Sequence, residues 1–198
     1  MKKLALILLL AGTLIPFLSQ AQQTYKIKSH NLIVSGTSNL HDWTATAEKA
    51  SGVFNIKFND KKMASVNAFE LKVDANSLKG SKGSIMNSKI IDALKAKKNP
   101  YITFKSTGGN LNEKSGVYKI SVNGILTIAG KSQNVIIEAQ GKMLPTGDIE
   151  FSGARKLRMT DYNIDPPTAM LGSLTTGDEV TLNFKLTLKS DESTAQNN

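Results

Sequence analysis

The chain has 198 residues, a formal net charge of +9 at pH 7 and no cysteine. The absence of cysteine excludes disulfide bonds, thiol catalysis and cysteine-ligated metal sites, so a folded domain must depend on its apolar core. The length suits one domain, and no internal repeat divides the chain.

The N-terminus has the pattern of an export signal. Two lysines precede an uncharged stretch at residues 4–18, and Ser19-Gln20-Ala21 has the small-x-small form of a signal-peptidase site. A membrane anchor is the alternative, but the stretch is shorter than the roughly 20 residues that span a bilayer, and Pro16 interrupts it. We therefore expect a signal peptide over residues 1–21, cleavage near Ala21 and a periplasmic or secreted protein.

The positive charge is spread along the chain. Cleavage would lower the net charge from +9 to +7, because it removes two lysines. Many other lysines alternate with apolar residues, as at Lys57, Lys119 and Lys185. This pattern is typical of a solvated surface, and its alternative is attraction to anionic lipid head groups, which would give peripheral membrane contact. Nucleic-acid binding is disfavoured, because no basic cluster is interleaved with aromatic residues.

Apolar and polar residues alternate in eight segments, mostly separated by Gly or Asn turns. Side chains alternate between the two faces of a strand, so each segment predicts a strand with one apolar face. The expected strands span residues 25–34, 44–58, 66–74, 101–106, 117–128, 135–139, 149–159 and 180–188. We predict an all-β fold over residues 22–190, an antiparallel barrel of about eight strands, followed by a disordered polar tail at 191–198.

One segment has helical rather than strand periodicity. Between residues 84 and 98, Met86, Ile90 and Leu94 recur at helical spacing. Pro100 should end this helix, because the residue before a proline avoids the α region. We therefore expect one α-helix inserted between strands. It either packs as part of the core or forms a lid over a cavity, and such a lid could touch a membrane.

The inward-facing positions of the predicted barrel are almost entirely apolar. Eight antiparallel strands enclose a space that side chains can fill or that can hold one small elongated ligand. An apolar lining suits an aliphatic chain better than a polar metabolite. The residues expected to line the interior are Phe69, Leu71, Phe104, Ile120, Val122, Leu126, Ile128, Ile137, Phe151, Met159, Leu182, Phe184 and Leu186.

Three polar residues are candidates for binding a ligand head group: Arg155, Asp161 and Tyr162. Arg155 has the parity of Phe151, so a regular strand would direct it inward, whereas a bulge at Gly153 would turn it outward. An inward arginine needs an acidic partner or a ligand head group, because an unpaired buried charge is costly.

Trp43, the only tryptophan, follows a polar loop. This position favours a residue that plugs one end of the barrel, and the alternative is a residue that stacks on the ligand.

No set of residues indicates an enzyme. The two histidines, His30 and His41, lack carboxylates at the spacing of a metal site, and Asp42 would point to the face opposite His41. A Gly-x-Ser-x-Gly elbow, a Walker motif and a dinucleotide fingerprint are all absent. We therefore expect no catalytic residues, no metal and no cofactor, and a hydrolase with an unrecognised site is the alternative.

Two neighbouring segments carry a resemblance to a known family. Residues 99–106 read Asn-Pro-Tyr-Ile-Thr-Phe-Lys-Ser, and residues 124–130 read Gly-Ile-Leu-Thr-Ile-Ala-Gly. Together they resemble the signature of the YceI-like family, in which a Pro and Ile-Thr-Phe-x-Ser precede Gly-x-Leu-Thr-Ile-x-Gly. Residues 159–164 are similar to a later family segment near the barrel mouth, and residues 165–172 resemble the form common in Bacteroidetes members.

The resemblance covers nearly all of the chain after the predicted signal peptide. It implies an exported, lipocalin-like barrel that binds polyisoprenoids. At residues 90–98 this chain departs from the aromatic, acidic stretch that many members carry, and this departure bears on the identity of the ligand more than on the fold.

From residues and resemblance together, we predict a protein that sequesters or carries a hydrophobic chain, such as an isoprenoid, a quinone or a fatty acyl group. The alternative is a solid barrel, a stress or surface protein whose partner is another protein. A hollow interior of several hundred Å³ would favour the carrier. The oligomeric state does not follow from the sequence.

Overall fold

The structure is a computed structural model, and it describes residues 21–191. The predicted signal peptide apart from Ala21, and the predicted tail apart from Asp191, lie outside the described residues. No helix within residues 21–191 combines the length and the apolar character needed to cross a bilayer.

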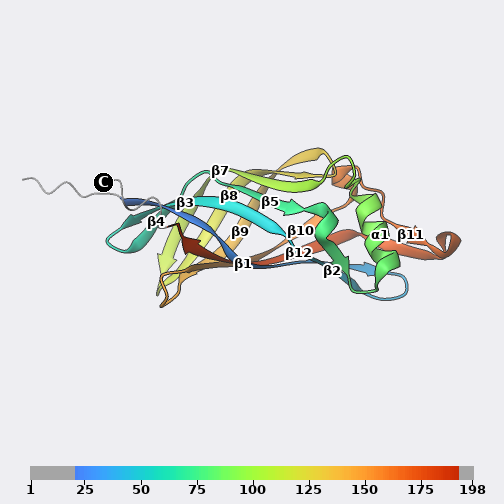
Figure 1. Ribbon diagram of the computed structural model, residues 1–198, viewed down its shortest axis with the longest axis horizontal. Coiled ribbons are helices and arrows are strands. Elements are labelled where there is room, and N and C mark those ends of the chain that lie inside the picture. The colour runs from blue at the N-terminus through green and yellow to red at the C-terminus, as the bar shows by residue number, and fades with distance from the viewer. Residues whose placement is uncertain (1–20, 192–198) are drawn as a thin grey trace, which may run out of the picture.

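Eight antiparallel strands form a closed barrel, as predicted (Figure 1). Neighbouring strands hydrogen-bond in the order β1-β3-β5-β7-β8-β9-β10-β12, and β12 pairs with β1 to close the ring. Their bounds are β1 Ala21–Ser38, β3 Ala50–Asn59, β5 Glu70–Asp74, β7 Tyr101–Lys114, β8 Val117–Ile128, β9 Lys131–Met143, β10 Ile149–Arg158 and β12 Leu174–Ser190.

Short elements extend the barrel at its edges. The four short strands are β2 Trp43–Ala47, β4 Lys62–Val66, β6 Leu78–Gly80 and β11 Thr168–Ala169. The three 3₁₀ turns are η1 Ala75–Ser77, η2 Thr160–Tyr162 and η3 Met170–Gly172. The first half of β1 pairs with β3 and its second half with β2, so β2 and β6 widen the wall at the end of the barrel that carries the helix (Figure 1).

Several of the predicted strand boundaries are wrong. The single strand expected at residues 66–74 is interrupted, because β4 ends at Val66 and β5 begins only at Glu70. The single strand expected at residues 44–58 is two strands, β2 and β3, because the backbone at Glu48 and Lys49 turns aside to bond Ser77 and Asp74. The strand expected at 101–106 continues to Lys114 as β7. A bulge after Ser106, with Gly108 at a positive φ of 128°, keeps β7 in register with β8.

The helix α1 spans Ser84–Ala93, so the prediction that it continues to residue 98 is also wrong. Lys95 adopts the left-handed conformation, with φ 51°. The Lys95 N–H donates to the Asp92 carbonyl at 2.9 Å, and the Ala96 N–H donates to the Ile91 carbonyl at 3.0 Å. These two bonds are the Schellman motif, which ends the helix before Pro100 can act.

The end of the barrel farthest from α1 is solid. Ile56, Ile149 and Leu188 have no exposed surface and border neither of the two pockets described below. Nearby, the Met63 N–H donates to the Tyr118 hydroxyl at 3.1 Å, so the polar atom of a buried tyrosine is satisfied. This packed half fixes the strands from which the open half of the barrel is built.

Candidate functional site

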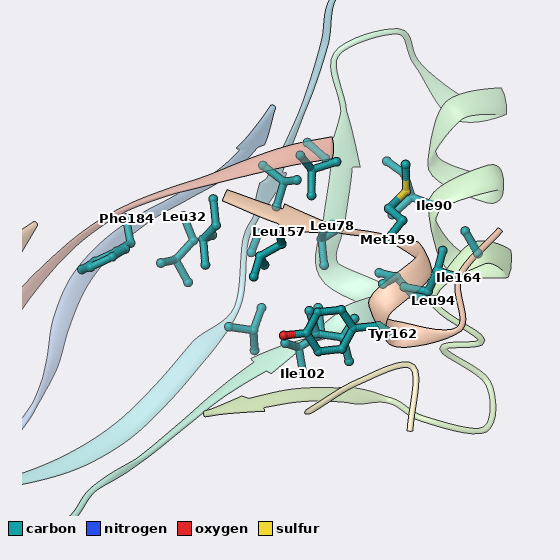
Figure 2. Close-up of a pocket in the computed structure, with 18 of the residues that line it drawn as sticks. Leu32, Leu78, Ile90, Leu94, Ile102, Leu157, Met159, Tyr162, Ile164 and Phe184 are labelled. Atoms are coloured by element: carbon teal, nitrogen blue, oxygen red, sulfur yellow. The ribbon is translucent and has the colours of Figure 1, made fainter. Parts of the chain in front are cut away.

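A cavity of about 530 Å³ occupies the half of the barrel nearest α1 (Figure 2). Side chains from all eight barrel strands line it, together with residues of β2, β6 and α1. Its volume falls in the range of small-molecule sites, about 300–1,000 Å³. The interior is therefore hollow at one end and filled at the other.

The structure places every predicted lining residue around this cavity. They are Phe69, Leu71, Phe104, Ile120, Val122, Leu126, Ile128, Ile137, Phe151, Met159, Leu182, Phe184 and Leu186. Residues next to them in sequence point outward, so Ile136 and Ile125 are exposed while Ile137 and Leu126 line the cavity. Contact of these residues with a ligand stays a prediction.

Three aromatic rings form a continuous row on one wall. The ring centroids of Phe54 and Phe69 lie 4.6 Å apart, and those of Phe69 and Phe104 lie 5.8 Å apart. The three rings come from β3, the segment before β5, and β7. They give this wall a rigid apolar surface.

Part of the lining was missed by sequence reasoning. Figure 2 shows Ile90 and Leu94 of the helical segment close to Met159 and Ile164, and all four border the cavity. The sequence showed the apolar stripe of the helical segment, but it did not show that this stripe lies against Met159 and Ile164. No side chain of α1 is fully buried, but Ile90 and Ala93 pack against the core, so the helix covers the end of the cavity.

The charged residues that line the cavity are all basic. Lys82 precedes α1, Lys89 lies on α1 and Arg158 lies at the end of β10. No Asp or Glu of the described residues borders the cavity. The Arg158 guanidinium is paired with Asp178 at 3.4 Å. Hydrogen bonds from the backbone and hydroxyl of Thr160, at 2.9 and 2.7 Å, and the Arg158 charge lower the pKa of Asp178.

The structure settles the orientation of Arg155. The β10–β12 ladder is regular from Ile149 to Arg158, so of the two alternatives the regular strand is present and the bulge at Gly153 is not. Arg155 therefore stays on the inner face with Phe151, directly opposite Leu182. Gly153 has a different role, because a Cβ there would lie 2.4 Å from the Glu138 carbonyl of β9.

Arg155 does not border the main cavity. The strands β9 and β10 pair only between residues 140–143 and 149–152, and beyond this point they separate. A side pocket opens there, and Arg155, Asp161 and Tyr162 all line it. The Arg155 Nε atom is buried without a hydrogen-bond partner.

Tyr162 lies between the side pocket and the main cavity and borders both. Its side chain is only 2% exposed. Burial raises the pKa of the Tyr162 phenol, and the nearby Arg155 charge opposes this shift. The structure thus brings the three head-group candidates together, but only Tyr162 reaches the cavity that the apolar residues enclose.

Trp43 lies on the wall at the mouth of the cavity. Its indole Nε1 donates to the Thr37 carbonyl at 3.1 Å. Its ring covers Gly36, where a Cβ would lie 2.4 Å from the indole. The tryptophan is therefore held in place by the hairpin itself and narrows the mouth.

Only one of the two histidines borders the cavity. His41 borders the mouth, whereas His30 lies opposite Leu186 on β12 and borders neither pocket. Within residues 21–191 no group of three or more His, Cys, Asp or Glu side chains could hold a metal ion.

Comparison with known proteins shows the family of the fold. The sequence model of the YceI-like domain matches residues 25–188. A search of curated protein sequences found no match.

Solved structures of the same fold include proteins from three bacteria. BcnA of Burkholderia cenocepacia is 22% identical, with a TM-score of 0.62 over 80% of this chain and 95% of its own. A polyisoprenoid binding domain of Saccharophagus degradans, implicated in plant cell wall breakdown, is 15% identical, with a TM-score of 0.64 over 85% and 99%. The YceI protein of Campylobacter jejuni is 21% identical, with a TM-score of 0.57 over 74% and 84%.

Proposed function

Because this chain belongs to the YceI-like domain family, we propose that it binds a hydrophobic chain inside its barrel and catalyses no reaction. The cavity of about 530 Å³, with its almost entirely apolar lining, is the observation that carries this proposal. Each CH₂ group that moves from water into such a lining contributes about 0.8 kcal/mol. A chain of several such groups would be held without any polar contact.

The ligand we propose is an isoprenoid, a quinone tail or a fatty acyl group. The Saccharophagus degradans structure is a polyisoprenoid binding domain, which supports the isoprenoid. The cavity holds no carboxylate among the described residues, which suits a ligand whose head group is neutral or anionic.

The head group of this ligand would bind at the side pocket. The buried Nε of Arg155 has no partner, and a carboxylate or phosphate oxygen would satisfy it. Tyr162 borders both spaces, so it would contact the ligand where the apolar chain meets the head group. Asp161 lines the same pocket and would orient a hydroxyl or amide group instead.

The two alternatives are weaker. A solid barrel that acts only through protein partners would not need a cavity of about 530 Å³. A serine hydrolase would need a histidine and a carboxylate near its nucleophile. His41 and Ser38 border the cavity mouth, but no carboxylate of the described residues borders it with them.

We also propose export from the cytoplasm, on the strength of the N-terminal pattern alone. Expression of the full chain in a bacterium, followed by cell fractionation and N-terminal sequencing, tests this. A mature protein that begins at or near Gln22 supports export. A cytoplasmic protein that retains Met1 would overturn it.

The lipid-binding proposal is tested by native mass spectrometry of the purified protein, combined with lipid extraction. Two adjacent isoleucines provide a matched pair of variants, because Ile137 lines the cavity and Ile136 is 48% exposed on the outside of β9. Ile137→Trp should reduce the bound lipid strongly, since the indole occupies the space of the chain. Ile136→Trp should leave loading unchanged.

Two results would contradict the lipid-binding proposal. A wild-type protein that carries no lipid after purification, and binds none when isoprenoid or fatty acyl ligands are added, is not a carrier. Equal loading of the Ile137→Trp and Ile136→Trp variants would place the lipid outside this cavity.

A further inference from the structure

The most exposed apolar side chains of the described residues lie around the mouth of the cavity. Leu171 is 108% exposed, Ile85 76%, Met170 74% and Leu40 67%, and no other large apolar side chain in residues 21–191 exceeds 55%. Scattered exposed apolar residues are normal, but a group of them at one place marks an interaction site.

Hydrogen bonds hold two of the contributing segments together. The Asn39 N–H donates to the Thr175 carbonyl at 3.1 Å, and the Asn39 Nδ2 donates to the Ser173 carbonyl at 2.8 Å. These bonds join the loop that carries Leu40 to the turn that carries Met170 and Leu171. Ile85, on the first turn of α1, borders the cavity itself, and Figure 1 shows the β11 turn projecting beyond α1 at this end of the molecule.

The backbone of this turn is strained at two residues whose side chains disfavour the conformation they adopt. Met170 has φ 51° and Leu171 has φ 55°, both in the left-handed region. Glycine, asparagine and aspartate normally occupy such positions, because other side chains clash with the backbone there. Here two largely exposed apolar residues occupy them, so neither packing in the core nor solubility explains the choice.

The charged side chains that border the cavity beside this group are positive. Lys82 and Lys89 border the mouth, and neither makes an ion pair within the described part of the chain. Asp42 and Asp165 are exposed on the adjoining loops, and no carboxylate borders the cavity. A surface that combines protruding apolar side chains with lysines fits an anionic lipid bilayer.

We propose that this end of the barrel docks on anionic membranes, with Met170 and Leu171 inserted among the lipid head groups. Leu40 and Ile85 would widen the inserted surface, and Lys82 and Lys89 would contact lipid phosphates. The mouth would then face the bilayer, so a hydrophobic chain could pass between membrane and cavity without crossing water. This last step rests on the proposed function, whereas docking itself does not.

The test is co-sedimentation of the purified protein, lacking residues 1–21, with two kinds of vesicle. One is phosphatidylcholine alone and the other contains added phosphatidylglycerol. We expect binding to the anionic vesicles, weakened by salt, and little binding to the neutral ones. The double variant Met170→Ser/Leu171→Ser should lose most of this binding, and Lys82→Gln and Lys89→Gln should each weaken it about fivefold.

Matched controls come from the side of the barrel. Val53 and Ile136 are exposed apolar residues away from the mouth, so Val53→Ser/Ile136→Ser should bind vesicles as the wild type does. Lys119→Gln, on the outside of β8, is the control for charge. The proposal is overturned if the turn variant binds like these controls, or if the wild type binds neither kind of vesicle.

Two further measurements separate this proposal from the carrier function and from self-association. Ile137→Trp should still bind vesicles. Vesicle binding therefore tests docking even if the protein fails to load lipid. Analytical ultracentrifugation of the wild type and the turn variant reports the oligomeric state. An oligomer that the turn variant dissociates, without vesicle binding by either protein, would assign the surface to a second copy of the chain and reject the membrane.

Discussion

Gly124 of β8 lies beneath the ring of Phe104 of β7, where a Cβ on the glycine would be 2.4 Å from two ring carbons. The two residues come from the two sequence segments that carry the family signature. Those segments are adjacent antiparallel strands, with Ser106 opposite Gly124 and Phe104 opposite Leu126. The glycine leaves the space in which the Phe104 ring lies along the inner wall.

Substitution of Gly124 by valine should therefore force Phe104 out of its position and into the cavity. Overpacking of this kind costs about 1–3 kcal/mol of the free energy of unfolding. Urea unfolding measures the cost for Gly124→Val alone and together with Phe104→Ala. The double variant should lose less stability than the sum of the single variants, and simple additivity would show that the two positions do not interact.

Two leucines on β12 should respond differently to the same deletion. Leu188 has no exposed surface and lies in the solid half, whereas Leu182 borders the cavity. Leu188→Ala should cost about 2–5 kcal/mol of stability, because it creates a cavity in packed surroundings. Leu182→Ala should cost less, because one side of that residue already faces open space, and thermal and urea melts of the two variants provide the comparison.

Arg155 tests the head-group proposal, because it lines the side pocket and its buried Nε has no partner. Arg155→Met removes a buried nitrogen that has no partner, so the ligand-free protein should be as stable as the wild type or more stable. The same variant should retain neutral lipids and lose those with carboxylate or phosphate head groups, as measured by extraction and mass spectrometry.

Lys119→Met is the control, since Lys119 is exposed on the outside of β8 and borders neither pocket. It should change neither stability nor the lipids that are bound. If Arg155→Met carries the same anionic lipids as the wild type, the side pocket is not the head-group site.

Stability should fall in acid. The hydrogen bond from Lys28, at 2.6 Å, lowers the pKa of Asp148, and hydrogen bonds from Lys185 and Lys142 lower that of Glu150. A carboxyl whose pKa is lower in the folded than in the unfolded state stabilises the fold above the unfolded pKa, about 4. That contribution is lost as the pH falls through the folded pKa.

Urea midpoints measured from neutral pH down to about pH 3 should therefore decline below about pH 4. Asp148→Asn should be less stable at neutral pH and should show a shallower decline, because one of the responsible groups is gone. An unchanged slope would mean that Asp148 has the same pKa in the folded and unfolded chains.

The barrel could be predicted because its strands are amphipathic. Each of the eight barrel strands has a run of alternating apolar and polar residues, and the part of β12 from Val180 to Leu188 is the most regular. The same alternation predicted which side chains face inward, and all the predicted lining residues border the cavity. Parity is a local property of a strand, so it can be read from the sequence alone.

The boundaries were less predictable, because they depend on partners distant in sequence. The break between β2 and β3 follows from bonds of Glu48 and Lys49 to the chain near Ser77. The helix ends at a left-handed lysine, Lys95, which carries no sequence signal comparable to glycine. The Lys95 ammonium donates to the Asn163 carbonyl at 3.0 Å, a contact made only in the folded molecule.

The sequence by itself determined the strand periodicity, the inward parity and the family. Only the tertiary structure decided that the barrel is filled around Ile149 and Leu188 and hollow around Phe104 and Leu182. Apolar side chains with the same parity occur along both halves, and whether they meet depends on how far apart the strands lie. That separation is set by the added strands β2 and β6 and by the parting of β9 from β10, which arise from contacts across the whole chain.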